Sequence, residues 1–457
     1  MEHNEQKRKK ILIVMAPEWA SFYATLKLAR ELKQGGSGYR VDYFGPPGLE
    51  EIVVAQDLGY RAFDIDGIYK DRIFHNLENE IGEKIKKSGG RPGKIGMYRA
   101  RMRAHLKTHQ EILRSIEELL IRDLPDLVLL GPLMVDYIVP FLKLKVPIIT
   151  LNFTLISIWS LTVPPVYSGV VPHSRLGLIS YGRNVLAWSK MFLKNFLFNT
   201  RTYCKFRFGF GFSPFYNLKK EAGKYGARLK RTDTKLRLHA PELVTCPKEF
   251  DFPFAARTNS RIYIGASLYT RRQEAPFDWK SINREKPIIY CTLGTTSMIY
   301  EHRKNLYQAV IEVIRQRPDL QLILQVGDEG EIEGFRPLPK NIFVYRWVPH
   351  MQVLPHTAIM ICHGGLGTVR EAVYFGVPLI VFPAERDDPG NSARVVFHHL
   401  GLRGNIKRVN ARKIHSLIDR LSNDGFIHRS VKRMQQVFRE QEDCRRGVEF
   451  IEEFLAS

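Results

Sequence analysis

The chain has 457 residues, of which 44% are hydrophobic, and carries a formal net charge of +22 at pH 7. This length is too great for one ordinary domain, so two domains are expected. The five cysteines are widely spaced, with no Cys-x-x-Cys pair, which argues against a disulfide framework or a zinc site and favours a reducing, cytoplasmic location. The positive charge predicts attraction to an anionic partner: lipid headgroups, nucleic acid or a phosphorylated substrate.

The first half of the chain has the pattern of a parallel α/β domain. Residues 11–15 and 41–44 are apolar runs of strand length, and residues 25–33 between them have an amphipathic helical pattern. Further apolar runs follow at 126–130 and 147–151. Strands that alternate with helices predict a parallel sheet with right-handed crossovers. Because the basic N-terminus precedes only a short apolar run, we expect a buried first strand there rather than a signal peptide.

Two stretches of this half are strongly basic. The stretch from Lys84 to Lys107 has nine Lys or Arg and no acid, and the stretch from Arg183 to Arg231 has twelve Lys or Arg and one acid. A solvated basic surface is one explanation. The other is contact with anionic lipid, to which each cation near the surface contributes about 1 kcal/mol. Residues 190–198 (KMFLKNFLF) suit a membrane interface but are too short and too charged to span a bilayer.

A second parallel α/β domain is predicted for the other half. Strands are expected at 286–293, 320–326 and 342–346, with a helix at 303–316. Between the halves, the proline-containing segment before residue 286 includes a short strand at 261–265 that is expected to enter the second domain. The expected division is an N-terminal domain at 1–250, a linker at 251–285, a C-terminal domain at 286–435 and a final helix at 436–457.

The stretch from Cys362 to Arg394 organises the second half. An apolar run at 358–362 leads into the loop His363-Gly364-Gly365-Leu366-Gly367, and residues 368–375 have helical composition. Glycines allow close approach of a ligand, and the first N–H groups of the helix point toward it, so phosphate is the usual occupant of such a turn. The next strand, at 378–382, delivers Asp387, Asp388 and Asn391 to the same edge, where ligands of open α/β sheets bind.

These residues resemble the C-terminal signature of the GT-B, UDP-glycosyltransferase-like family. The matching elements are His363-Gly364-Gly365, Gly367-Thr368, Glu371-Ala372, Gly376-Val377-Pro378, Pro383, Asp387-Asp388 (Asp-Gln in the family), Asn391 and Arg394. Upstream, Trp347-Val348-Pro349-His350 resembles the family's Trp-x-Pro-Gln base platform, and residues 287–295 resemble its phosphate-side loop. The resemblance implies an α/β GT-B fold, in which two Rossmann-like domains with parallel sheets face a central cleft and the last helix packs back on the first domain.

The resemblance also implies roles in binding a nucleotide sugar. Trp347 would stack on uracil or thymine beside His350, Glu371 would accept from ribose hydroxyls, and the diphosphate would lie at His363 and the helix start. The full set of expected donor-binding residues is Gly294, Thr295, Trp347, His350, His363, Gly364, Gly365, Gly367, Thr368, Glu371, Asp387, Asp388 and Asn391. Because such groups stabilise the departing diphosphate, neither a metal nor another cofactor is required.

Each role has a structural alternative. Trp347 could be a core residue and His363 a satisfied loop histidine. Glu371 and Asp388 could be solvated carboxylates. An ionised Asp388 cannot donate a hydrogen bond as the family's Gln does, so the sugar would differ from the common glucose unless this carboxyl is protonated.

The catalytic base departs from the family pattern. Family members use a histidine near the start of the first helix, and this column falls on Ser21 or near Phe22, while the column of the Asp that orients the histidine falls on Gly131. The hypothesis is that Asp136, or in second place Glu18, accepts the acceptor's proton, since both follow first-domain strands at the edge where the cleft is expected.

The sequence therefore predicts an inverting glycosyltransferase that moves a hexose from a UDP- or dTDP-sugar to a hydroxyl of a hydrophobic or lipid-type acceptor. It most resembles the bacterial carotenoid, sterol and macrolide glucosyltransferase branches. Peripheral contact with the inner face of the cytoplasmic membrane is expected through the two basic stretches. The alternative is a silent nucleotide-sugar-binding accessory protein that has lost the base. Nucleic-acid binding is not expected, because no recognition motif accompanies the charge.

Overall fold

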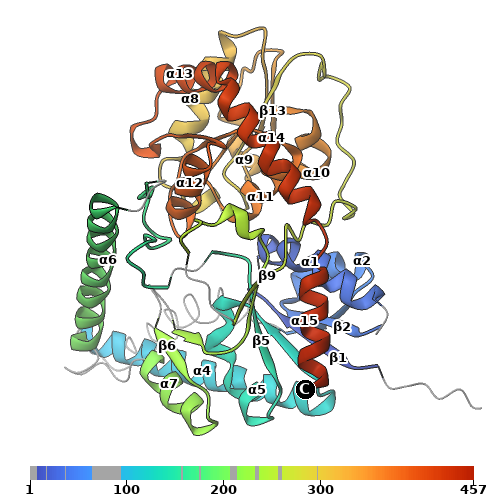
Figure 1. The fold of residues 1–457 in the computed structure, drawn as a ribbon, viewed down its shortest axis with the longest axis vertical. Coiled ribbons are helices and arrows are strands. Elements are labelled where there is room, and N and C mark those ends of the chain that lie inside the picture. Colours follow the sequence, from blue (N-terminus) through green and yellow to red (C-terminus); the bar gives the residue numbers. More distant parts are fainter. Residues whose placement is uncertain are drawn as a thin grey trace, which may run out of the picture.

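The computed structural model (Figure 1) describes residues 8–16, 18–35, 38–63, 94–155, 158–173, 177–205, 214–231, 236–255, 260–295 and 297–457. Residues 84–93 of the first basic stretch lie outside the described residues, and the rest of that stretch begins helix α4 (Lys94–Arg122). Within the described ranges, no helix is long and apolar enough to cross a bilayer.

The first half of the chain forms a seven-stranded, all-parallel sheet in the order β3-β2-β1-β4-β5-β8-β9. The predicted strands at 11–15, 41–44, 126–130 and 147–151 are confirmed as β1, β2, β4 and β5. The bounds are β1 (Lys10–Val14), β2 (Arg40–Gly45), β3 (Gly59–Ala62), β4 (Leu127–Leu130), β5 (Ile148–Asn152), β8 (Glu242–Val244) and β9 (Arg261–Tyr263).

Both faces of this sheet are buried, which explains why its central strands are apolar at successive positions. Ile11 and Ile13 of β1 point into a core shared with α1, whereas Leu12 and Val14 point into a second core shared with α4 and α5. The remaining elements of this half are α1 (Trp19–Gln34), α2 (Glu50–Ala55), α5 (Val139–Lys143), α6 (Leu178–Lys205), α7 (Pro214–Lys224) and the antiparallel pair β6 (Leu229–Arg231) and β7 (Leu236–Leu238).

The second half forms a six-stranded parallel sheet in the order β12-β11-β10-β13-β14-β15. Its strands are β10 (Ile288–Thr292), β11 (Gln321–Gln325), β12 (Ile342–Tyr345), β13 (Thr357–Cys362), β14 (Leu379–Val381) and β15 (Gly401–Arg403). Its helices are α8 (Arg303–Arg315), α9 (Glu329–Glu333), α10 (His350–Val353), α11 (Leu366–Phe375), α12 (Asp388–Phe397), α13 (Ala411–Asn423) and α14 (Gly425–Glu440). The two parallel sheets confirm the predicted α/β architecture.

The short strand β9 corrects one prediction. It was expected to enter the second domain, but Arg261–Tyr263 pairs in parallel with β8 and forms the edge of the first sheet. Three residues carry too little pattern to indicate which sheet they join. We propose that the first domain extends to residue 263, and that the linker begins after it.

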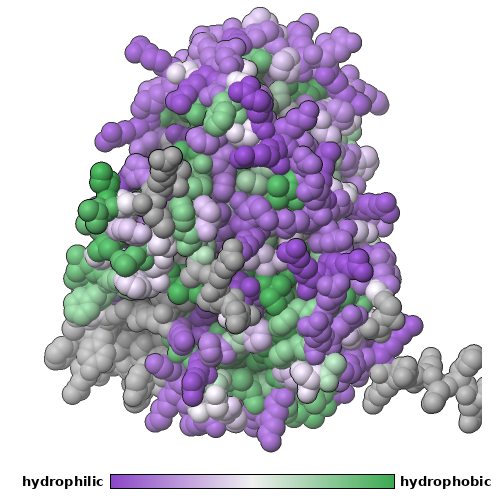
Figure 2. Space-filling view, in the orientation of Figure 1, coloured by the Kyte–Doolittle hydropathy of each residue, from purple (hydrophilic) through white to green (hydrophobic). Residues whose placement is uncertain are grey.

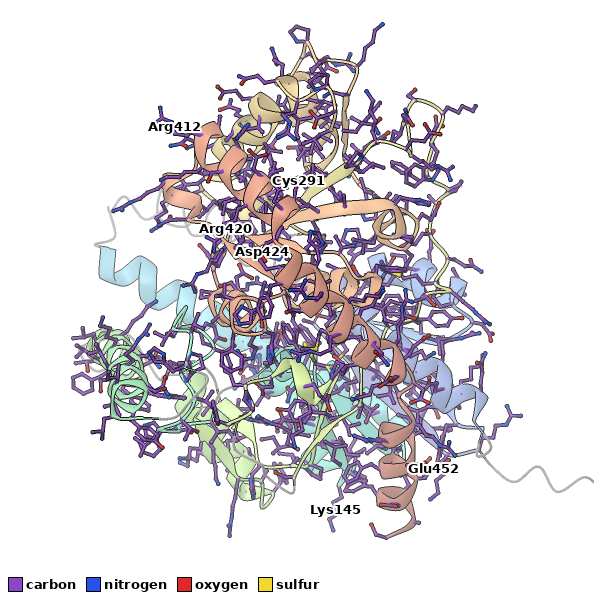
Figure 3. The ribbon with its side chains drawn as sticks, turned by 45° about the horizontal axis from the view of Figure 1, so that its top comes forward. Lys145, Cys291, Arg412, Arg420, Asp424 and Glu452 are labelled. Carbon is purple, nitrogen blue, oxygen red and sulfur yellow. The ribbon has the colours of Figure 1, made fainter. Side chains whose placement is uncertain are left out.

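The last segment of the predicted division, residues 436–457, includes the end of helix α14 and the whole of helix α15. Helix α14 begins after Asp424, whose carboxylate caps the helix by accepting from the backbone N–H groups of Phe426 and Ile427. Helix α15 (Arg445–Ala456) then returns to the first half and packs on α1. Figure 3 marks the start of α14 with Asp424 and the course of α15 with Glu452.

Candidate active site

A cleft lies between the two halves, at the carboxyl ends of the strands of both sheets. Its lining includes most of the residues predicted from the second half, from the loops after β10, β12, β13 and β14. The predicted residues in the lining are Glu18, Gly294, Thr295, Trp347, His350, His363, Gly365, Gly367, Thr368, Glu371, Asp387 and Asp388. Sequence reasoning missed Ala20, Tyr23, Ala24, Phe153, Thr154, Arg272, Tyr300, Gln325, Leu366, Arg370 and Arg386.

The glycine loop places His363 at the start of α11. Gly364 has φ +95°, and a Cβ there would lie 2.7 Å from Val381 Cγ1. A Cβ on Gly294, which has φ +76°, would lie 2.7 Å from His363 Cε1, and a Cβ on Gly365 would collide with His363 Nε2. The imidazole therefore occupies a slot that exists only because both neighbouring positions are glycine.

His363 is buried and uncharged at neutral pH. Burial, assisted by the charges of His350 and Arg386, lowers the pKa of His363 to about 4. Its Nδ1 has no hydrogen-bond partner among the described residues, so the alternative of a satisfied loop histidine is not supported. A neutral imidazole can still donate one N–H, and the uncapped N-terminus of α11 supplies further N–H groups beside it.

Glu371 is buried in an ion-pair network rather than solvated. Arg272 Nη1 donates to Glu371 Oε1 at 2.8 Å, and His350 Nδ1 lies 2.6 Å from Glu371 Oε2. Burial alone would raise the pKa of Glu371, but the charges of Arg272 and His350 outweigh it and lower the pKa to about 2. Arg272 also binds Glu274 at 2.6 Å and lies 4.2 Å from the centre of the Tyr23 ring. Glu371 is therefore ionised and fixed in orientation.

Asn391 joins the two signature motifs of the second half. Its Nδ2 donates to the carbonyl oxygen of Gly364 and to Asp387 Oδ2, both at 2.9 Å. Neither Gly364 nor Asn391 appears in the cleft lining. Their role in the structure is to hold the glycine loop and the start of α12 together.

Asp388 is a buried carboxyl with an unusual pKa. Its Oδ2 accepts from the backbone N–H groups of Ala384 at 3.3 Å and Glu385 at 3.0 Å. Burial and the neighbouring Asp387 nevertheless raise the pKa of Asp388 to about 8. At neutral pH the carboxyl is largely protonated and can donate a hydrogen bond, as the family's Gln does.

Trp347 is half-buried and lines the cleft, so it is not a core tryptophan. The next residue, Val348, donates its backbone N–H to Gln325 Oε1 at 3.1 Å, which anchors the loop after β12. The ring of Trp347 therefore borders the cleft on an anchored segment, as stacking on a base requires.

Parts of the chain are similar in sequence to known glycosyltransferases. A family model described as the C-terminal domain of erythromycin biosynthesis protein CIII-like proteins matches residues 313–441. The chain is 25% identical over 194 residues to an uncharacterized UDP-glucosyltransferase, YdhE, of Bacillus subtilis, covering 42% of this chain and 48% of that protein. It is 29% identical over 198 residues to the demethyllactenocin mycarosyltransferase of Streptomyces fradiae, covering 43% and 41%. The chain thus matches about half the length of these curated relatives.

Solved structures extend the likeness over the whole fold. The glycotransferase of kitacinnamycin superposes with a TM-score of 0.69 at 20% identity, over 98% of this chain and 100% of that one. The glycosyltransferase VinC, solved in complex with dTDP, superposes with a TM-score of 0.63 at 15% identity, over 98% and 99%. The chain has the GT-B fold of these structures, and its second half is similar in sequence to glycosyltransferases.

In this GT-B protein the three candidate bases occupy different surroundings. Glu18, at the start of α1, lines the cleft and pairs with Arg386 at 3.3 Å. Ser21 is fully buried on α1, and Asp136 lies in the 3₁₀ helix η3 (Pro132–Tyr137). Among the described residues that line the cleft, Glu18 is present whereas Ser21 and Asp136 are not.

Two buried arginines connect the two halves of this GT-B structure. Arg394, which sequence analysis matched to the family signature, forms a buried ion pair with Asp251 at 2.6 Å. Arg370 donates to the backbone carbonyl oxygens of Thr245 and Ala266. Arg394 belongs to the family signature but is not part of the cleft lining. This part of the signature therefore joins the two halves of the structure. Among the described residues, no cluster of His, Cys, Asp or Glu is arranged to hold a metal ion.

Proposed function

We propose that the protein is a glycosyltransferase that moves a hexose from a UDP- or dTDP-sugar to a hydroxyl of a hydrophobic or lipid-type acceptor, with inversion at the anomeric carbon. The observation that carries the proposal is the composition of one cleft. A half-buried tryptophan, an ionised ribose-side carboxylate, a neutral histidine at a helix start and a protonated carboxyl line it together. The relatives whose printed names state an activity are glycosyltransferases.

The donor would lie along the second half of the cleft. Its base would stack on Trp347, its ribose would hydrogen bond to Glu371, and its diphosphate would lie at the N-terminus of α11 beside His363. Breaking the bond to the sugar leaves additional negative charge on the diphosphate. The preorganised N–H groups of α11 and His363 would stabilise that charge most strongly in the transition state.

Asp387 and Asp388 would bind the sugar. A protonated Asp388 offers an O–H donor, while its other oxygen accepts from the backbone N–H groups of Ala384 and Glu385, so it can donate to a hexose hydroxyl as the family's Gln would. The expectation that the sugar differs from glucose applied to an ionised Asp388, and it loses its basis when this carboxyl is neutral.

Glu18 is our first candidate for the general base. It faces the second half of the cleft from α1, so a hydroxyl between it and the sugar could pass its proton to the carboxylate while attacking the anomeric carbon. Arg386, at 3.3 Å, would hold the carboxylate in place. Asp136 stays a second candidate.

The alternative function is a nucleotide-sugar-binding accessory protein without transferase activity. One observation favours it: an added Cβ at Gly131 would lie 3.0 Å from Met15 Sδ and 3.2 Å from the Val14 carbonyl oxygen, so the family's aspartate would fit here only if these neighbours moved by a few tenths of an ångström. Burial of Ser21 in the histidine column points the same way.

A cytoplasmic location with peripheral contact with the inner face of the membrane is part of the proposal. The basic stretches from Lys84 to Lys107 and from Arg183 to Arg231 support it, because their excess of cations favours anionic lipid.

The deciding experiment is transfer from a panel of UDP- and dTDP-sugars to a bacterial lipid extract, followed by mass spectrometry. A new glycosylated lipid is expected, and it would identify both substrates. Tight binding of UDP or dTDP by calorimetry, with no product from any extract, would replace the transferase by the accessory protein.

A further inference from the structure

Helix α6 (Leu178–Lys205) stands at the side of the molecule, away from both sheets (Figure 1). Its buried side includes Asn184 and Trp188, and both side chains donate hydrogen bonds to the segment 158–173. Asn184 Nδ2 donates to the Leu161 carbonyl oxygen at 2.9 Å, and Trp188 Nε1 donates to the Val163 carbonyl oxygen at 2.8 Å. Side-chain bonds to an irregular segment therefore fix which side of α6 faces outward.

The outward side of α6 is apolar, the reverse of an ordinary surface helix. Figure 2 shows hydrophobic residues gathered along the edge of the molecule where α6 lies. The most exposed large side chains are Leu178 (89% exposed), Ile179 (74%), Leu186 (55%), Leu193 (57%), Phe196 (63%) and Leu197 (57%). Such an exposed apolar band marks a surface that is covered by a partner.

The segment that holds α6 continues this surface. Ile158 is 40% exposed, Trp159 is 57% exposed and Leu161 is 46% exposed. Since the carbonyl oxygen of Leu161 is bonded to α6, these side chains lie next to the helix. The apolar surface therefore consists of side chains from two segments of the chain, α6 and residues 158–161, and it includes the indole of Trp159.

The positive charges beside the exposed apolar band of α6 indicate which kind of partner covers it. Exposed Arg183, Lys190 and Lys194 fall on one flank of the apolar band at 100° per residue, and α6 contains no Asp or Glu. A second copy of this chain would bring two cationic flanks together, which is unfavourable. An anionic lipid surface complements both features, because headgroups attract the cations while the acyl boundary covers the apolar band.

The same segments lead to the cleft. Phe153 and Thr154, which follow β5, line the cleft just before segment 158–173. Further along that segment, Val166 packs so closely on Gly390 of α12 that no side chain fits at position 390. The apolar surface is thus joined to the acceptor end of the cleft and to the helix that begins with Asp388.

We propose that the outward face of α6, together with residues 158–161, inserts into the headgroup region of an anionic bilayer, and that a lipid acceptor reaches the cleft from this surface. The second clause rests on the proposed transferase function, whereas the first does not. Helix α6 lies in the interface plane and does not cross the bilayer, since it carries five cations in 28 residues.

Sedimentation of the full-length protein with vesicles of phosphatidylglycerol and phosphatidylcholine tests the insertion. Wild type is expected to bind these vesicles at least about tenfold more tightly than the triple variant Leu186→Ser, Leu193→Ser, Leu197→Ser. A matched control replaces the equally exposed Val54 and Ile121 with serine on other helices, and it should bind as wild type. Equal vesicle binding by wild type and the triple variant would overturn the proposal.

Fluorescence tests whether the surface enters the bilayer. Vesicles that contain brominated lipid should quench the exposed Trp159, and Trp159→Phe should remove most of the quenching, because Trp188 is only 2% exposed. Binding without quenching would mean that charge alone attracts the protein to lipid and would overturn insertion.

Two further measurements distinguish a defective membrane surface from a defective donor site and from a dimer interface. Affinity for UDP or dTDP should be the same in wild type and the triple variant, so a failed donor site is distinguishable from a failed membrane surface. If light scattering shows a wild-type dimer that the triple variant dissociates, and wild type does not bind vesicles, the surface joins two copies of the chain and the lipid proposal is wrong.

Discussion

The two sides of the cleft differ in how their polar groups are held. On the second-half side, Glu371 has two charged partners, Asn391 links the glycine loop to α12, and Asp388 accepts two backbone N–H groups. On the first-half side, Ala20, Ala24 and Phe153 contribute apolar surface. A ligand of fixed polar pattern suits the first of these environments, and an apolar ligand suits the second.

If the donor binds on the second-half side and the acceptor on the first-half side, as proposed, the two substrates are recognised by separate sets of residues. Arg272 reaches Glu371 from the segment between the halves and contacts the Tyr23 ring, whereas the bonds of Asn391 and Asp388 lie within the second half. The polar groups on this side are therefore held in place before a ligand enters from the other side. Changes to each side should therefore alter different measurements, and the predictions below use this separation.

The largest expected effect is on turnover and comes from the first-half side. Glu18→Gln keeps a hydrogen-bonding side chain beside Arg386 but cannot accept a proton, so turnover should fall about 10²–10⁴-fold while affinity for UDP or dTDP is unchanged. Asp136→Asn is the matched comparison and should retain turnover within about threefold. Loss of turnover in Asp136→Asn alone would assign the base to Asp136.

The next largest expected effect is on the free energy of unfolding, and it comes from removing the ion pair between Asp251 and Arg394 that joins the halves. Asp251→Ala leaves Arg394 buried without its partner, so urea unfolding should show a loss of about 3–5 kcal/mol. The exposed pair between Arg445 and Glu449 is a control, because Glu449→Ala should cost less than about 0.5 kcal/mol. A small change in Asp251→Ala would mean that the halves are joined mainly by other contacts, such as those of Arg370.

The third expected effect is on nucleotide affinity, and it comes from a change on the second-half side of the cleft. Gly294→Ala places a methyl group against the His363 ring at a backbone φ of +76°, so affinity for UDP or dTDP should fall about 10–100-fold. Gly48→Ala is the control, since a Cβ at Gly48 meets nothing within 4 Å. Unchanged nucleotide binding in Gly294→Ala, measured by calorimetry, would remove His363 from the donor site.

The sequence predicts those features whose residues lie close together in the chain, and it misses those that depend on distant residues. The glycine loop, Glu371 and the two aspartates lie within one short stretch, where local spacing indicates both the fold and the site. Arg272 could not be predicted, because it reaches Glu371 from 99 positions away and from a segment interpreted as linker. Its buried position depends on Tyr23 and Glu274, which only tertiary packing brings together.

The sequence indicated that residues 190–198 suit a membrane interface, but it could not indicate which side of α6 faces outward, for a related reason. Its aromatic and aliphatic residues suit a core equally well, and a helical pattern does not say which side faces the protein. The bonds of Asn184 and Trp188 to segment 158–173 decide this, and that segment has no regular pattern of its own. The base was ambiguous because Glu18 and Asp136 both follow strands, and only the packing of the loops separates them.

The smallest expected effect concerns the protonation of Asp388. Its folded-state pKa, about 8, is above its value in the unfolded chain, so between about pH 4 and pH 8 the folded state binds the extra proton and stability falls as pH rises. Wild type should therefore lose about 1–2 kcal/mol more than Asp388→Asn between pH 6.5 and pH 8, measured by urea unfolding. Asparagine keeps an N–H donor at every pH. In wild type only, the affinity advantage of a nucleotide sugar over the bare nucleotide should therefore fade above pH 8.

Parallel stability profiles for wild type and Asp388→Asn would mean that Asp388 is ionised at neutral pH. The sugar site would then accept hydrogen bonds but donate none through this residue, and the donor sugar would have to supply the protons.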